Sequence, residues 1–81
     1  MQLELYASLM RFLPPDAERH RIRLDVVAGT TAHDLLDRYQ VPREQAHLVL
    51  RNGVFLHAGE RDDLALGEGD VIAVWPPVAG G

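Results

Sequence analysis

The sequence contains neither cysteine nor lysine, and each absence excludes a kind of chemistry. Without cysteine the chain cannot form disulfides, zinc-thiolate sites or a thiol nucleophile, and cysteine usage says nothing about the redox compartment. All eight basic residues are arginine, so the N-terminal amine is the only primary amine. The chain is therefore a poor acceptor for acyl transfer to lysine, although it can still be a donor.

Long apolar runs and an excess of positive charge are also missing. The 81 residues are 47% hydrophobic and 25% charged, as in one globular domain. No run approaches the roughly 18 apolar residues of a membrane helix, and the net charge of -4 does not favour nucleic acid. The first residues indicate a strand rather than a signal peptide. We therefore expect a cytoplasmic protein that binds neither membranes nor nucleic acid.

Side chains for conventional catalysis are sparse. The four histidines stand 10 or more positions apart, so none forms the helical i, i+4 pair of a metal site. Ser8 is the only serine and lacks a glycine elbow. The acidic residues between Glu60 and Asp70 indicate a solvated face, with docking of a basic partner as the alternative. We predict no metal site, no bound cofactor and no catalysis by the chain alone.

The first half of the chain alternates in two places. Residues 2–7 and residues 20–27 each place apolar side chains at every second position, which predicts two strands paired antiparallel. Residues 9–13 between them indicate a short helical turn that ends at two prolines. A helix follows Thr31, because Thr31 and Asp34 resemble a capping box, and Val41-Pro42 ends it.

The second half contains a hairpin and an apolar strand. Residues 47–51 and 54–57 flank Asn52-Gly53, a strong hairpin signal. Residues 62–66 are expected to form one turn that buries Leu64 and Leu66. Residues 71–75 are continuously apolar, as in a central strand covered on both faces.

The order of these elements predicts the fold. Two strands, a helix, two strands, a turn and a last strand indicate an α+β protein with the β-grasp arrangement of ubiquitin-like domains. We expect a mixed sheet of four to five strands with one main helix packed across it. A split βαβ sandwich is the alternative, but it requires a second full helix. Residues 1–77 are assigned to the domain and residues 78–81 to a flexible diglycine tail.

The C-terminal residues carry the candidate chemistry. Pro76 and Pro77 cannot continue a strand, and they direct the chain outward. Residues 78–81 reach about 13 Å if fully extended, far enough to enter another protein's active site. Gly80 and Gly81 lack Cβ atoms and so fit a narrow channel. A carboxylate is a poor electrophile, so a partner enzyme must activate it.

Aromatic residues near this tail have two interpretations. Phe12 and Trp75 either pack in the core or present an aromatic surface that anchors a partner. Because Trp75 directly precedes the prolines, the second interpretation connects it with the tail.

Several motifs resemble a known family. The ending Val74-Trp75-Pro76-Pro77-Val78-Ala79-Gly80-Gly81 is similar to that of the small, sulfur-carrying subunit of molybdopterin synthase. The segments Leu5-Tyr6-Ala7-Ser8-Leu9-Met10-Arg11 and Gly67-Glu68-Gly69-Asp70-Val71 resemble its first strand with the following turn, and its turn into the last strand. The chain thus resembles the MoaD/ThiS type of sulfur carrier over its whole length.

This resemblance implies a mechanism and partners. An adenylyltransferase of the ubiquitin-activating type would use ATP to adenylate Gly81, and a persulfide would convert it to a thiocarboxylate. The tail would then enter the large subunit of molybdopterin synthase and donate sulfur. Gly81 would react and Gly80 would give steric clearance. The residues expected to bind the partner are Phe12, Trp75, Pro76, Pro77 and Val78.

Other functions stay open. Thiamin sulfur carriers share the Gly-Gly end, but they are typically shorter and lack the double proline; transfer RNA is another acceptor. A ubiquitin-like modifier would join Gly81 to lysines of other proteins. Residues 12–15, 41–44 and 48–53 resemble ubiquitin-like domains that often lack the diglycine, which would make the chain an interaction module.

Overall fold

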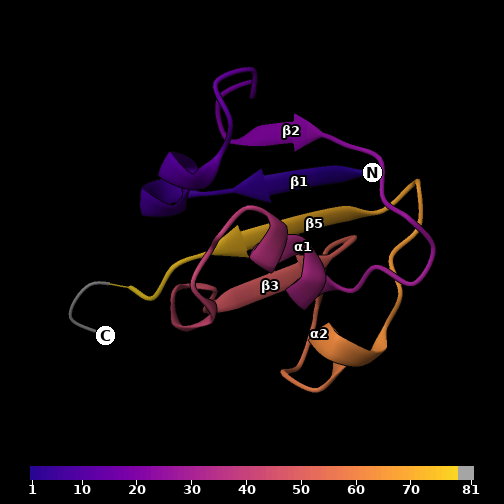
Figure 1. Ribbon diagram of the computed structural model, residues 1–81. Helices are drawn as coiled ribbons and strands as arrows, with labels where there is room; N and C mark the ends of the chain where they lie inside the picture. The colour runs from indigo at the N-terminus through magenta and orange to yellow at the C-terminus, as the bar shows by residue number, and fades with distance from the viewer. Residues whose placement is uncertain (79–81) are drawn as a thin grey trace.

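Five strands form one mixed sheet in the order β2-β1-β5-β3-β4 (Figure 1). The strands are β1 (Gln2–Leu5), β2 (Arg21–Arg23), β3 (Leu48–Arg51), β4 (Val54–Phe55) and β5 (Val71–Trp75). The α-helices are α1 (Ala32–Arg38) and α2 (Glu60–Asp63), and the 3-10 helices are η1 (Ala7–Phe12) and η2 (Arg43–Gln45). This computed structural model describes residues 1–78. The predicted β-grasp is confirmed, since α2 is too short for the split βαβ alternative.

The central position of β5 follows from its apolar sequence. β5 runs parallel to β1 and antiparallel to β3, so both of its edges are paired. The register aligns Leu3 with Ile72 and Leu5 with Val74, and all four side chains are buried. The predicted central position is confirmed. The predicted cover on both faces is wrong, because Val71 and Trp75, on the face opposite α1, are only half-buried.

β2 is shorter than the predicted strand of residues 20–27. It pairs antiparallel with β1, as expected, but over Arg21–Arg23 only. Arg19 has a left-handed backbone with a φ of 56°, which turns the chain just before the strand. At the other end the Leu24 N–H donates to the Met1 carbonyl, which is the last backbone contact between the two strands. The pairing with β1 therefore covers only part of the predicted strand.

α1 begins at the predicted capping box. The Thr31 side chain accepts from the Asp34 N–H at 3.2 Å, and the Asp34 carboxylate accepts from the Thr31 N–H at 3.1 Å. These bonds satisfy backbone donors that the first helical turn leaves unpaired. Beyond Arg38 the chain turns through Gln40, whose φ is 60°.

The hairpin between β3 and β4 has the expected turn. Asn52 and Gly53 both have positive φ values, 52° and 83°, as a type I′ turn requires. The predicted hairpin is confirmed, although β4 itself is only two residues long.

The turn predicted at residues 62–66 is α2 (Glu60–Asp63). Leu66 is buried as expected, but Leu64 is 38% exposed, so the prediction of its burial is wrong. Arg61 occupies the buried position of α2. Of the two leucines in this segment, only Leu66 turns inward, and its N–H donates to the Thr30 carbonyl at 2.7 Å.

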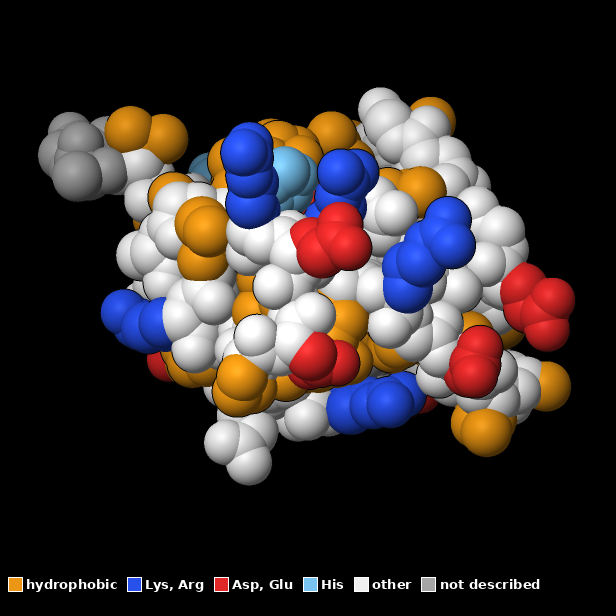
Figure 2. Space-filling model, turned by 90° about the horizontal axis from the view of Figure 1, so that it is seen from above, with side chains coloured by type: hydrophobic (Ala, Val, Ile, Leu, Met, Phe, Trp, Pro, Cys, Tyr) orange, Lys and Arg blue, Asp and Glu red, His pale blue; other side chains and the backbone are white. Residues whose placement is uncertain are grey.

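The core lies between one face of the sheet and α1, which crosses in front of β5 and β3 in Figure 1. Its large, completely buried side chains are Leu3, Leu5, Leu9, Leu35, Leu36, Val49, Ile72 and Val74. Within residues 1–78, no helix is both long and apolar enough to span a membrane. Figure 2 looks onto the edge of the sheet formed by β2, where arginine and acidic side chains are interspersed with apolar surface.

Candidate functional site

The end of β5 is the candidate site, because the chain leaves the sheet there (Figure 1). Pro76 and Pro77 lack the N–H groups that would extend the strand. Pro77 is exposed and Val78 is 75% exposed, so the described chain points into solvent at this position. Gly80 and Gly81 lie outside the described residues, and their role stays a prediction.

Backbone hydrogen bonds hold the last two residues of β5 from both sides. The Tyr6 N–H, just after β1, donates to the Val74 carbonyl at 3.0 Å. The His47 N–H, just before β3, donates to the Trp75 carbonyl at 3.0 Å. Both neighbouring strands therefore contribute to the point at which the tail begins.

The Trp75 ring belongs to a stack of three rings. The Tyr6 ring lies parallel to it, with centroids 4.2 Å apart and planes 1° apart. His20 stacks on Tyr6 at 4.6 Å. Trp75 is half-buried, so it is neither a core residue nor a fully exposed aromatic side chain, the two alternatives that the sequence offered. One ring face packs against the protein itself, and the exposed remainder lies beside the exit of the tail.

Tyr6 also links this stack to the polar part of the sheet. Its hydroxyl donates to Glu4 Oε1 at 2.9 Å, and the Gln2 amide donates to Glu4 Oε2 at 2.6 Å. Burial raises the pKa of Tyr6, and the hydrogen bond to Glu4 and its charge raise it further, while Arg21 opposes them. The phenol is therefore a neutral hydrogen-bond donor that orients the ring.

The sheet face opposite α1, called the open face below, has two halves. Strand alternation and the pairing register place apolar residues on its β3-β4-β5 half: Leu48, Leu50, Phe55, Ala73 and Trp75. They place polar residues on its β1-β2 half: Gln2, Glu4, Arg21 and Arg23. A depression of about 560 Å³ lies along β2, away from Trp75. The apolar half is thus the part of the open face that adjoins the tail.

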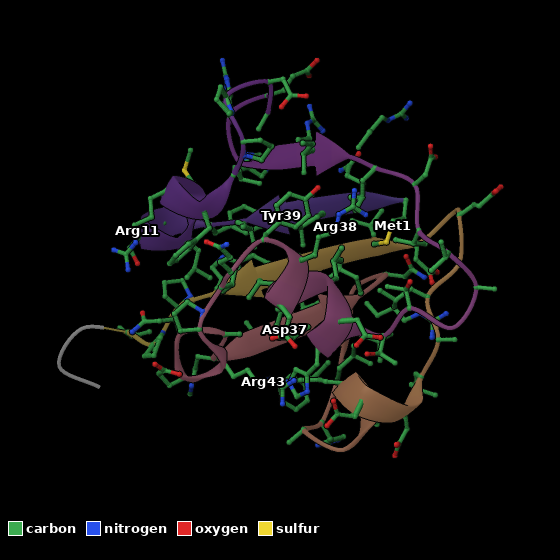
Figure 3. All side chains as sticks on the ribbon, in the orientation of Figure 1. Met1, Arg11, Asp37, Arg38, Tyr39 and Arg43 are labelled. Carbon is green, nitrogen blue, oxygen red and sulfur yellow. The ribbon has the colours of Figure 1, made fainter. Side chains whose placement is uncertain are left out.

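Phe12 lies on η1 and packs partly against the core. The Arg11 guanidinium stands 4.8 Å from the centroid of its ring. Arg11 lies at the same end of the sheet as the exit of the chain after β5 (Figure 3). The role of Phe12 in partner binding stays a prediction, and its neighbour Met10 is more exposed.

Comparisons with known proteins agree with this geometry. A model of the ThiS family matches residues 6–81. The chain belongs to the ThiS family. The crystal structure of SAMP1 from Haloferax volcanii is similar, with 30% sequence identity and a TM-score of 0.65 over 99% of this chain and 97% of that one. Among curated proteins, none matches the chain significantly. The prediction of a ubiquitin-like sulfur carrier is confirmed at the level of the family.

In this ThiS-family chain, Arg61 is a feature that sequence reasoning missed. Its side chain is only 9% exposed, and all of its hydrogen bonds go to carbonyl oxygens. Nε donates to Leu56, Nη1 to Ala46 and Nη2 to His47, at 3.0, 3.0 and 3.4 Å. Burial lowers the pKa of Arg61, but a guanidinium keeps its charge in proteins. No local pattern predicts this burial, because two of the three carbonyls lie 14 and 15 residues away in the chain.

Asp70 is a second missed feature, at the opposite end of β5. Its Oδ2 accepts from the Gly67 N–H at 2.7 Å and from Arg51 Nη2 at 2.9 Å, and its Oδ1 accepts from Asn52 at 2.9 Å. The Gly67 and Asn52 hydrogen bonds are the main causes that lower the pKa of Asp70, and Arg51 adds to them. Asp70 is thus a structural residue rather than part of a solvated acidic face.

The other acidic residues have more ordinary positions. Asp62 and Asp63 are exposed, as predicted, and Asp62 Oδ1 lies 2.8 Å from His33 Nδ1, which joins α2 to α1. Asp37 on α1 pairs with Arg43 on the surface, where Figure 3 shows the two side by side. No group of three metal-ligating side chains occurs in residues 1–78.

Proposed function

We propose that this chain carries sulfur as a thiocarboxylate on Gly81 and donates it in molybdopterin synthesis. The observation that supports this most is the exit of the central strand. β5 ends at Trp75, two prolines follow, and Val78 is exposed, while the ThiS-family match continues through residue 81. A terminal carboxylate presented in this way suits an enzyme that acts on it from outside.

The chemistry requires activation before sulfur transfer. The Gly81 carboxylate attacks the α-phosphate of ATP in an adenylyltransferase of the ubiquitin-activating type, which forms an acyl-adenylate and releases pyrophosphate. A persulfide then displaces AMP, and a thiol reductant cleaves the resulting acyl disulfide to leave the thiocarboxylate. ATP is bound by the partner enzyme, and this chain supplies the carboxylate that attacks it and, after adenylation, the electrophilic carbonyl.

The described residues suggest how partners bind. The apolar half of the open face provides a surface beside the tail, with Trp75 at its border. Pro76, Pro77 and Val78 lead from that surface toward a partner's active site. Apolar residues around an exposed aromatic ring are typical of protein interfaces. The same surface would serve the activating enzyme and the large subunit of molybdopterin synthase in turn, in the cytoplasm.

The acceptor is assigned from the tail motif. The Pro-Pro-Val-x-Gly-Gly ending is the feature that favours the pterin over a thiazole or a transfer RNA base. Purified thiocarboxylated chain should convert the cyclic pterin precursor when the large subunit is present. Transfer to a thiazole precursor instead would contradict the pterin assignment and leave the carrier function intact.

Intact mass spectrometry of protein from its own host tests the carrier function. We expect a chain that ends at Gly81, with a fraction heavier by one exchange of oxygen for sulfur and reactive toward an alkylating reagent. A variant without Gly81 is the control and should show no such species. An unmodified acid alone, even with the activating enzyme and ATP, would favour an inert interaction module. Conjugates to lysines of other proteins would favour a modifier.

A further inference from the structure

Arg61 is an unusual residue, because a buried guanidinium normally pairs with a carboxylate. Among residues 1–78, no acidic side chain forms a salt bridge with it. Its charge is instead stabilised by three backbone carbonyl dipoles and by the Phe55 ring, whose centroid is 5.7 Å away. Burial of a cation is costly, so the contacts that it makes need an explanation.

One of those contacts leads to the end of β5. Nη1 of Arg61 donates to the Ala46 carbonyl at 3.0 Å. The N–H of the same peptide group belongs to His47, and it donates to the Trp75 carbonyl at 3.0 Å. Because a trans peptide points its C=O and N–H in opposite directions, this peptide lies between Arg61 and Trp75.

We infer that Arg61 is a positioning residue, which fixes the direction of the tail by holding the 46–47 peptide against the Trp75 carbonyl. A cation on the carbonyl side polarises the peptide and strengthens its N–H as a donor. The Trp75 carbonyl belongs to the Trp75–Pro76 peptide, the first peptide bond after β5. Its orientation therefore sets the direction in which Pro76 and Pro77 leave the sheet.

The geometry also explains why this residue is arginine. The three carbonyls belong to Ala46, His47 and Leu56, and each accepts from a different nitrogen. A planar guanidinium with five N–H groups can serve three acceptors at once, whereas a lysine offers one nitrogen. α2 thereby ties the segment before β3 to the segment after β4.

Hydrogen exchange of the His47 amide tests the positioning directly. In Arg61→Gln we expect this amide to exchange about tenfold faster, because its hydrogen bond to Trp75 opens more often. The matched control is Arg51→Gln, which loses the contact with Asp70 at the other end of β5. That control should affect exchange of Asn52, whose N–H bonds to the Val71 carbonyl, and leave His47 unchanged.

The second readout is activation of the tail, and it rests on the proposed function. With the activating enzyme and ATP, Arg61→Gln should lower kcat for acyl-adenylate formation about tenfold with little change in KM, because docking is intact and the tail is misdirected. Arg51→Gln should leave both constants unchanged even if it destabilises the fold. An equal loss in the two variants would show that Arg61 acts only through stability and would overturn the inference.

A milder variant keeps the test decisive if Arg61→Gln does not fold. Arg61→Lys keeps the charge, but its N–H groups share one nitrogen and cannot reach all three carbonyls, so it should show the same two changes. Unchanged His47 exchange in a folded Arg61 variant would overturn the inference. An inactive wild type would overturn the proposed function instead, and the exchange experiment would still decide whether Arg61 holds the strand end.

Discussion

The two ends of β5 are held in different ways. At its start, the Asp70 carboxylate accepts hydrogen bonds from Gly67, Arg51 and Asn52. These bonds connect the turn before β5 to the β3-β4 hairpin. At its end, Trp75 is held through its carbonyl and one face of its ring. At the start of β5 a charged side chain fixes the turn that leads into the strand. At the end of β5 no side-chain network closes around the chain, which continues outward.

This difference matches the demands on each end. A carboxylate bonded to several donors is stable in one position, which suits a turn into a central strand. The proposed function requires an exit that is rigid up to Trp75 and then releases the chain, so a carbonyl and a stacked ring suit it better than a closed network. We therefore expect the stability of the fold and the presentation of the tail to depend on different residues. Four experiments test this expectation.

Deletion of Gly81 should have the largest effect. Thiocarboxylate formation is expected to disappear, because the reacting carboxylate would move to Gly80 and no longer reach the activating centre. The melting temperature should not change, because the hydrophobic core is formed by side chains between Leu3 and Val74. Mass spectrometry with thermal unfolding checks both. Persistent sulfur loading would contradict the role of Gly81.

Asp70→Ala should lower the stability of the fold and leave sulfur loading intact, which is the reverse of the Gly81 deletion. The variant leaves Arg51 and Asn52 without their acceptor, and we expect a loss of about 2 kcal/mol in the free energy of unfolding. Sulfur loading at a temperature where the variant is folded should be retained. Urea titration is the measurement, and Glu68→Ala is the control, because Glu68 is an exposed acid on the same turn. Equal stability of the two variants would contradict the role of Asp70.

Acid should weaken the same end of β5. The folded pKa of Asp70 lies below its unfolded value of about 3.8, so the unfolded chain takes up the proton first. The stabilisation is complete above that value and is lost as pH falls through the folded pKa. Urea titrations from about pH 5 to about pH 2 should show the stability gap between wild type and Asp70→Ala shrinking. A constant gap would mean that the Asp70 charge contributes nothing.

Tyr6→Leu should have the smallest effect, at the other end. Loss of ring stacking is expected to cost about 1 kcal/mol. Trp75 is the only tryptophan, so its fluorescence should change when the stacked ring is removed. Tyr39→Leu is the control, because Tyr39 lies after α1 and makes no stack with Trp75. An unchanged emission spectrum in Tyr6→Leu would contradict the stack.

Features encoded by neighbouring residues were predictable. Thr31 and Asp34 are three positions apart, and Asn52 and Gly53 are adjacent, so the helix start and the hairpin follow from local geometry. The tail motif was also predictable, because proline lacks a backbone N–H and glycine lacks a Cβ atom whatever residues surround them. These features account for the β-grasp and for the candidate site at residue 81.

Long-range features were not predictable. The length of β2 depends on how far it pairs with β1, and the exposure of Leu64 depends on how α2 packs. The Arg61 contacts join positions 46, 47, 56 and 61, which no spacing rule relates.

The sequence by itself determined the elements, their order and the tail, because capping, turn formation and strand alternation depend on near neighbours. Only the tertiary structure decided how that tail is held. It brought Tyr6 against Trp75 and placed one peptide between Arg61 and the Trp75 carbonyl. The physical reason is that a buried charge or a stacked ring is stable only when distant segments meet around it.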